Sequence, residues 1–353
     1  MNLVRHELYK IFSKKVVIIG IVMLVGFTLL KALQLSDINN VFKTYNNAVK
    51  SGQNPIMISK EKYEILYNTI SYPNIWWLNH EKQLTELKNE ITKLEKVNGT
   101  NSYTYREKNL EYTYLKKIAS PDTNSYSSIW QCIFNNDDIY CFIAFLIILG
   151  ISPIFSEEYS TSVDALILSS KKGRNPIVRA KLLAAVAYIF VIAGFACTLQ
   201  TILDISMLGN GNWSNPIQIY YSTVAFPLSM FGYFVLQFLT NLAADIALGL
   251  FILVVSAKAK NLLIPAFTGI VAVVAINVIG SIQSILPQGL KNLTDFYYIR
   301  YIYSDYLYKN FKEFNILGHP VLYPYLAFFV MLVASISCIL MTKRLFIKHS
   351  VSN

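Results

Sequence analysis

Residues that commonly carry chemistry are scarce in this sequence. It holds four cysteines and four histidines among 353 residues. Cys197 and Cys338 lie inside apolar runs, Cys132 and Cys141 lie near the start of another, and no pair has the spacing of a metal or redox motif. We therefore expect the cysteines to act as small apolar side chains, and we predict neither a disulfide framework nor a metal site.

Catalytic motifs are also missing. No G-x-x-x-x-G-K-S/T segment occurs, so the chain lacks the loop that cradles nucleotide phosphates. The pair His6-Glu7 is followed by Lys10, where a zinc-protease helix needs its second histidine. We therefore expect a protein that is not an enzyme, has no catalytic residues and binds no cofactor itself.

Charged residues make up 15% of the chain, whereas 54% of it is hydrophobic. Six apolar runs are long enough to cross the hydrocarbon core of a bilayer. They lie at 15–35, 139–156, 182–203, 230–255, 262–279 and 323–345. The sequence therefore predicts an all-α integral membrane protein with six transmembrane helices, three of them within 182–279.

Positive charge is concentrated in the short segments between these runs. If the N-terminus is cytoplasmic, the inner segments hold the excess of Lys and Arg behind the net charge of +10, and the outer segments are nearly neutral. This distribution follows the positive-inside rule and places both termini in the cytoplasm, with 346–353 as a tail. The basic character then favours membrane lipid over nucleic acid as a partner. We expect a multi-pass plasma-membrane protein, and abundant Lys, Asn, Ile and Tyr are compatible with a Gram-positive bacterium.

Two segments flank the first apolar run. In 1–14 the apolar residues share one helical face, which predicts an amphipathic helix on the inner membrane surface. Segment 36–138 is expected to be extracellular. Its apolar residues recur at helical spacing on both sides of a turn at 98–101, which predicts a helical hairpin. The sequence leaves open whether this hairpin is a spacer or dimer contact, or a surface that captures a substrate or partner.

Segment 157–181 joins the second and third apolar runs. It begins with acidic residues, continues with Val163, Leu166 and Ile167 on one face of an amphipathic stretch, and ends among basic residues. Such a segment cannot cross a membrane. It can lie at the inner surface, with its apolar face against lipid or a partner protein.

The order and spacing of this segment resemble the intracellular loop of type-2 ABC exporter permeases. Glu158, Ser162, Arg174 and Lys181 fall on the family's positions for a Glu ending the second span, a small residue, a basic residue and a Lys opening the third span. Ser162 stands where the family usually has Gly. The resemblance covers the membrane portion of the chain and leaves out the extracellular hairpin.

The resemblance implies a complex of two permease subunits, as a homodimer or a heterodimer, with two ATPase subunits that bind ATP and Mg. The intracellular loop would couple the two kinds of subunit. Val163, Leu166 and Ile167 would lie in a groove of the ATPase, while Glu158 would pair with Arg174 or with a basic residue of the N-terminal helix.

The resemblance further implies an exporter for amphipathic or hydrophobic cargo. Small Gram-positive permeases that resemble this chain often export antimicrobial or toxic peptides or confer immunity to them, so a peptide is the expected cargo. Ions, drugs and glycans stay open. The connection 280–322 would form short helices that dip into the outer leaflet. A membrane-anchored sensor or scaffold, whose extracellular hairpin binds a partner, is the alternative from another class.

A polar stripe interrupts the fourth apolar run. Gln237, Asn241 and Asp245 are spaced four residues apart, so they lie on one face of a helix. Polar groups at this depth face protein or a water-filled cavity. The stripe either bonds neighbouring helices together or lines a substrate path.

Overall fold

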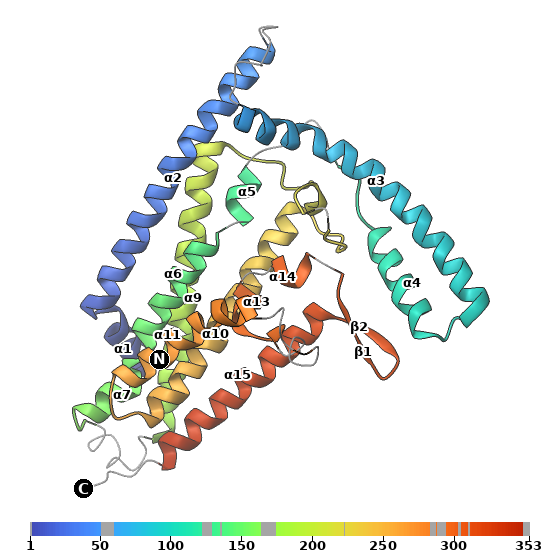
Figure 1. The fold of residues 1–353 in the computed structure, drawn as a ribbon. Coiled ribbons are helices and arrows are strands. Elements are labelled where there is room, and N and C mark those ends of the chain that lie inside the picture. The colour runs from blue at the N-terminus through green and yellow to red at the C-terminus, as the bar shows by residue number, and fades with distance from the viewer. Residues whose placement is uncertain are drawn as a thin grey trace.

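The computed structural model describes residues 2–50, 60–121, 129–134, 136–163, 174–221, 223–282, 287, 294–302, 305–309 and 311–348. The described chain is mostly helical (Figure 1). Its longer helices are α1 Asn2–Phe12, α2 Lys15–Lys50, α3 Lys60–Asn98, α4 Tyr103–Leu115, α6 Asp137–Ile151, α7 Pro153–Ser160, α9 Arg174–Leu208, α10 Met230–Lys258, α11 Leu263–Ile282 and α15 Tyr323–Lys348. Short elements are α5 Ile129–Phe134, η2 Ile217–Ile219, α13 Tyr298–Ile302, α14 Asp305–Tyr308, β1 Glu313–Ile316 and β2 His319–Leu322.

Five helical stretches of the described chain are long and apolar enough to cross a membrane. They are Lys15–Leu33, Cys132–Ser160, Arg174–Leu208, Met230–Lys258 and Tyr323–Lys348. The run 262–279, predicted as the fifth of six spans, falls on α11, whose described apolar part is the shorter Leu263–Val274. The structure is thus compatible with a multi-pass helical membrane protein, and the sixth span stays a prediction.

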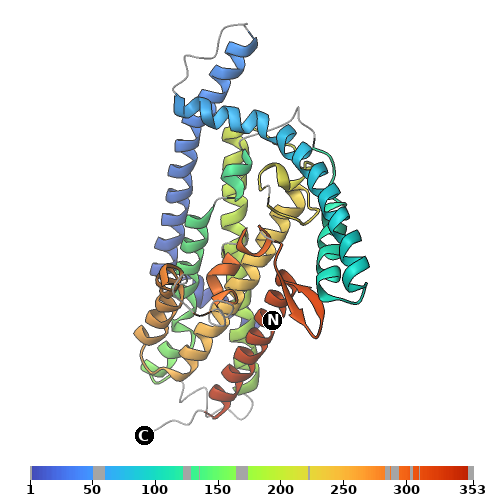
Figure 2. The same ribbon diagram turned by 45° about the vertical axis from the view of Figure 1, so that its right-hand side comes forward.

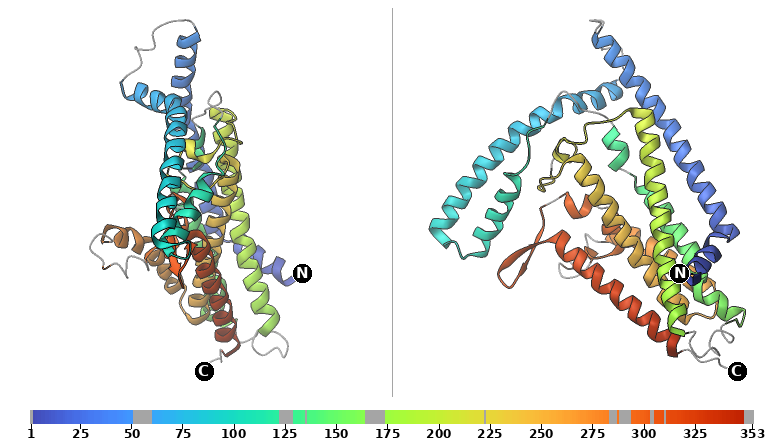
Figure 3. Two further views of the ribbon diagram at one scale, coloured as in Figure 1. Left: turned by 90° about the vertical axis from the view of Figure 1, so that its right-hand side faces the viewer. Right: turned by 180° about the vertical axis from the view of Figure 1, so that it is seen from behind.

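The helices bury three apolar clusters and leave an apolar surface outside. The largest joins α1, α2, α6, α7, α9, α10 and the end of α15, and the second joins α5, η2, α10, α13, α14 and the start of α15. A smaller cluster lies between α3 and α4. Large apolar side chains on the outward faces, such as Val22, Phe190, Phe267 and Phe329, are more than half exposed. An apolar exterior of this extent is costly in water and favourable in lipid. Helix α1 lies across the direction of these long helices (Figure 3).

Helices α3 and α4 form the hairpin that the sequence places around 98–101. The turn needs Gly99, whose φ of 72° lies in the left-handed region, and Ser102 then caps α4 by accepting a hydrogen bond from the Tyr105 backbone N–H at 3.3 Å. The arms are unequal, because α3 extends back to Lys60. The hairpin does not stand free, since α4 lies beside β2 (Figures 1 and 2).

Strands β1 and β2 are the one departure from the predicted all-α fold within the described chain. They pair antiparallel around Leu317 and Gly318, whose φ angles of 53° and 82° are both positive, as in the tight turns that suit β-hairpins. The Gly318 backbone N–H donates to Asn315 Oδ1 at 2.9 Å. Pro320 disfavours a helix here, because it lacks the backbone donor that a helix interior needs.

The contact between α4 and the β-hairpin contains charged groups. Arg106 donates from Nη1 to the Gly318 carbonyl oxygen at 3.2 Å. Burial, together with the Glu107 carboxyl group on α4, raises the pKa of Glu313 on β1 to about 7. The Glu313 carboxyl group is therefore mostly protonated below about pH 7.

Candidate functional site

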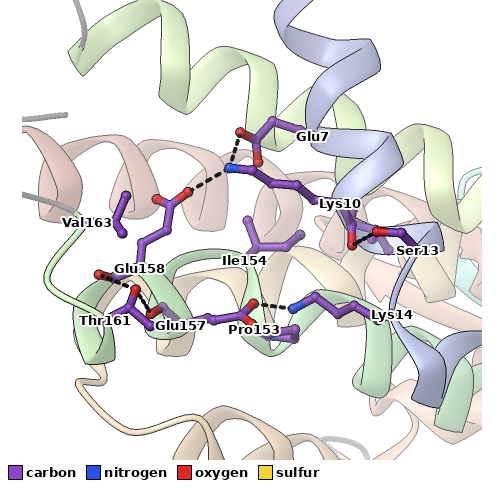
Figure 4. Close-up of a pocket in the computed structure, with 12 residues that line it drawn as sticks. Glu7, Lys10, Ser13, Lys14, Pro153, Ile154, Glu157, Glu158, Thr161 and Val163 are labelled. Carbon is purple, nitrogen blue, oxygen red and sulfur yellow. Dashed lines mark hydrogen bonds and ion pairs between the residues drawn. The ribbon is translucent and has the colours of Figure 1, made fainter. Parts of the chain in front are cut away.

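Four charged side chains meet where α1, α7 and α9 come together. Helix α1 carries Glu7 and Lys10 one turn apart, so both lie on the same face. Glu158 lies near the end of α7, and Lys181 lies near the beginning of α9. We call Glu7, Lys10, Glu158 and Lys181 the charge cluster. Figure 4 shows three of its members, with Lys10 between the two acids.

Lys181 is the best-bonded member of the charge cluster. Its Nζ lies 2.7 Å from Glu158 Oε1 and 3.1 Å from Glu7 Oε2, and it donates to the Ile154 carbonyl oxygen at 2.9 Å. Lys10 Nζ lies 3.2 Å from Glu158 Oε1 and 3.2 Å from Glu7 Oε1. Two acids and two bases balance, so the ionised cluster has no net charge.

Burial makes these pairings necessary. Lys181 is 1% exposed and Glu158 8% exposed, and a charge so far from water is tolerated only when it is paired. Burial raises the pKa of Glu7, but Lys181 and Lys10 outweigh it, so this pKa lies below its usual value. Burial lowers the pKa of Lys10, yet Glu7 and Glu158 outweigh it, and the pKa lies above its usual value. Both shifts favour the ionised cluster.

A short break at Ser152 separates α6 from α7, the helix that carries Glu158. Helix α6 ends before Ser152, and α7 starts with Pro153, which suits a first helical position because it has no N–H to satisfy. Ser256 of α10 fastens this break. Its Oγ accepts from the backbone N–H groups of Phe155 and Ser156 at 3.1 and 3.2 Å and donates to the Ser152 carbonyl oxygen at 2.7 Å.

The chain leaves α7 through a backbone conformation that favours glycine. Ser162 has a φ of 58°, and the Val163 backbone N–H then donates to the Glu158 carbonyl oxygen at 3.0 Å. This geometry explains why a small residue suits position 162. Val163 is 42% exposed, as a contact residue needs to be. Leu166 and Ile167, predicted on the same face, lie outside the described residues.

The predicted loop 157–181 is shorter in the structure than in the sequence analysis. Helix α9 already begins at Arg174, so Lys181 is a buried helical residue and does not end a loop. Of the two partners expected for Glu158, the structure has the basic residue of the N-terminal helix, Lys10. Arg174 instead donates from Nη1 to the Ile347 carbonyl oxygen of α15 at 2.9 Å.

A cavity of about 430 Å³ lies beside the charge cluster, between α1, α6 and α7 (Figure 4). Glu158 and Val163 both line it, and so do Lys14 and Glu157, whose side chains form an ion pair. Glu158 Oε2 is buried and has no hydrogen-bond partner among the described residues. The site is therefore a polar hollow next to the connection between α7 and α9.

The sequence matches no family model and no curated protein. The resemblance to type-2 ABC exporter permeases therefore rests on the spacing of the residues described above. In the part of the chain that the structure describes, no three His, Cys, Asp or Glu side chains gather in a group that could hold a metal ion.

The first and last members of the polar stripe on α10 each bond to another element. Gln237 is 4% exposed and donates from Nε2 to the Phe134 carbonyl oxygen of α5 at 3.2 Å. Asp245 is 2% exposed and accepts from the Tyr298 hydroxyl group of α13 at 3.0 Å. The stripe therefore ties α10 to elements before and after it in the chain.

Asn241, between these two residues, makes the most contacts of the stripe. With its amide nitrogen facing α13, it donates to the carbonyl oxygens of Tyr301 and Ile302 at 2.9 Å each, and its oxygen accepts from the Tyr140 hydroxyl group at 3.1 Å. All three stripe residues thus contact protein groups. These contacts favour helix bonding over a substrate path.

The sequence analysis missed two members of these sites. Glu7 was considered only as the neighbour of His6, although its spacing from Lys10 puts both on one helical face. Tyr298 was not singled out. Nothing local distinguishes it, because its partner Asp245 lies far away in the chain.

Proposed function

We propose that this chain is the permease subunit of an ATP-driven exporter of the type-2 ABC class. In this proposal it has six spans, both termini in the cytoplasm and an extracellular helical domain. Two copies, or one copy and a related subunit, assemble with two ATPase subunits that bind ATP and Mg. The charge cluster is the observation that carries the proposal.

The charge cluster supports a mechanical role. Glu7 and Lys10 on α1, Glu158 on α7 and Lys181 on α9 hold three helices together at both ends of the connection 164–173. A force applied to this connection would move the three helices together, because separating them would leave the buried charges of Glu158 and Lys181 without partners. An ATPase that presses on the connection would therefore displace whole spans.

Contacts beyond the cluster would carry such a displacement across the bundle. Ser256 fastens the α6–α7 break to α10, and Arg174 fastens the beginning of α9 to the end of α15. A movement at the connection would thus reach α10 and α15. In this proposal the cargo is an amphipathic or hydrophobic molecule, and a toxic or antimicrobial peptide is the first candidate because the resemblance favours it. Ions, drugs and glycans are the other candidates.

Val163, the exposed residue next to the connection 164–173, provides the test. Val163→Asp places a charge in the proposed ATPase contact and should reduce recovery of an ATPase with the purified protein by about tenfold or more. Val97→Asp is the matched control, because Val97 is 80% exposed at the end of α3, far along the chain from the connection. Full recovery with Val163→Asp would contradict the placement of the contact.

A second function is favoured by the size of the α3–α4 hairpin. A helix that runs from Lys60 to Asn98 outside the apolar stretches provides a large surface for a partner of a membrane-anchored sensor or scaffold. The same purification separates the two functions. A scaffold would be recovered without any ATPase, whereas an exporter subunit would bring an ATPase that has the phosphate-binding loop.

A further inference from the structure

A second cavity of about 340 Å³ lies on the seam between α10 and α15. Ala247 and Phe251 of α10 line it on one side and Val330 and Ala334 of α15 on the other, while Tyr297 and its neighbours cover it. We call it the seam pocket. Its volume lies within the range of about 300–1,000 Å³ that is usual for pockets that bind small molecules.

The lining of the seam pocket sets the chemistry of its occupant. Its described lining residues are Ala, Leu, Phe, Tyr, Val and Met, and none is charged. The Tyr297 hydroxyl group donates to the Ala272 carbonyl oxygen at 3.0 Å, and the Tyr298 hydroxyl group donates to Asp245. The Tyr301 hydroxyl group is buried and has no hydrogen-bond partner among the described residues, so the lining is apolar except at this one group. Apolar cavities stay dry and accept hydrocarbon, so this lining favours a hydrocarbon chain over a polar molecule.

The position of the seam pocket identifies the source of that chain. Ala247 lies in the middle part of α10, a helix of 29 residues, which is about 43 Å long and exceeds the hydrocarbon core of a bilayer. Phe251 and Val330 at the pocket are 39% and 36% exposed, and Phe329 beside it is 62% exposed. The mouth thus opens onto the same apolar surface that the five candidate spans present to lipid.

We propose that the seam pocket binds one acyl chain of a bilayer lipid, which inserts from the side between α10 and α15. The chain packs under Tyr297 and Tyr298 and so holds the segment 296–301 against α10. This contact is independent of the ATPase and of the exported cargo. The position of the segment 296–301, which precedes α15 in the chain, then depends on bound lipid.

The test uses phosphatidylglycerol with a photoreactive diazirine near the end of one acyl chain, in nanodiscs that hold the full chain. Illumination should label the α10 peptide that contains Ala247 and Phe251, and the labelling should saturate at a low fraction of the probe. Ala334→Trp fills the mouth from an exposed position and should lower this labelling about fivefold or more. Val333→Trp, on the neighbouring outward face, is the matched control and should leave it unchanged.

Two results would overturn the proposal. One is labelling of α10 that is equal in Ala334→Trp and the unchanged protein. The other is labelling that rises in proportion to the probe and stays on the outward face around Phe329, which is the behaviour of surrounding lipid. Circular dichroism of each variant verifies that the helices are intact.

Discussion

Removal of the Lys181 charge should destabilise the protein far more than removal of the Lys10 charge. Lys181→Met keeps most of the side-chain volume, but it leaves the buried carboxylates of Glu158 and Glu7 without their closest partner. Loss of one member of a buried ion pair costs about 3–5 kcal/mol. Lys10 has a side chain that is 43% exposed, so Lys10→Met should cost at most about 1 kcal/mol.

A double-mutant cycle measures the coupling energy of the Lys181–Glu158 pair directly. In Lys181→Met/Glu158→Gln the buried charge and its partner are removed together, so the cost should be smaller than the sum of the two single changes. We expect a coupling energy of about 2 kcal/mol or more for this pair, against at most about 1 kcal/mol for Lys10 with Glu158. The Lys14–Glu157 pair is the matched control, because the Glu157 side chain is 53% exposed.

Denaturant unfolding of each variant in detergent micelles, followed by circular dichroism, measures these energies. The reasoning fails if Lys181→Met and Lys10→Met cost the same. It also fails if the coupling of Lys181 with Glu158 is no larger than that of the exposed control pair. Either result would mean that Lys181 reaches water and that the cluster does not hold the three helices together.

Two further predictions concern the contact of α4 with the β-hairpin and the packing of α6. The pKa of Glu313 is raised from 4.5 to about 7, so this carboxyl group binds its proton more tightly when α4 lies against the β-hairpin. The contact should therefore be strongest below about pH 4.5 and weaken as the pH rises to 7. Glu313→Gln should remove this dependence, as measured by distances between spin labels on α4 and the β-hairpin. An unchanged distance across that range would contradict the raised pKa of Glu313 in this contact. Gly150→Ala should destabilise by about 1–3 kcal/mol, because its added carbon would meet the buried Tyr188 ring at 2.5 Å. Gly194→Ala, where nothing lies within 4 Å, should instead stabilise the helix by about 0.5–1 kcal/mol, and equal effects of the two changes in thermal unfolding would refute the packing argument.

Elements with a strong local signal could be predicted from the sequence. The long helices follow from apolar runs whose length exceeds what a soluble helix needs. The break between α3 and α4 follows from Gly99, which adopts a positive φ at little cost. The β-hairpin could not be predicted in this way, because each strand is only four residues long and the turn at Leu317 places a non-glycine residue at positive φ.

The candidate site also contains residues that could be predicted from the sequence and contacts that could not. Glu158, Ser162 and Lys181 could be selected by their spacing at the end of one apolar run and the start of the next. The spacing did not reveal that α9 begins at Arg174, because whether 174–181 is helix or loop depends on its packing against α1. It therefore did not reveal that Lys181 is buried.

The sequence alone determined the apolar helices, the charged segments between them and the polar stripe on α10, because each is a pattern of neighbouring residues that acts through the local backbone. Tertiary structure decided which groups meet: Lys181 with Glu7 and Glu158, Asp245 with Tyr298, and α4 with β2. The physical reason is burial. A charge or a hydroxyl group far from water must find a partner, and the partner available in the fold lies tens of residues or more away along the chain.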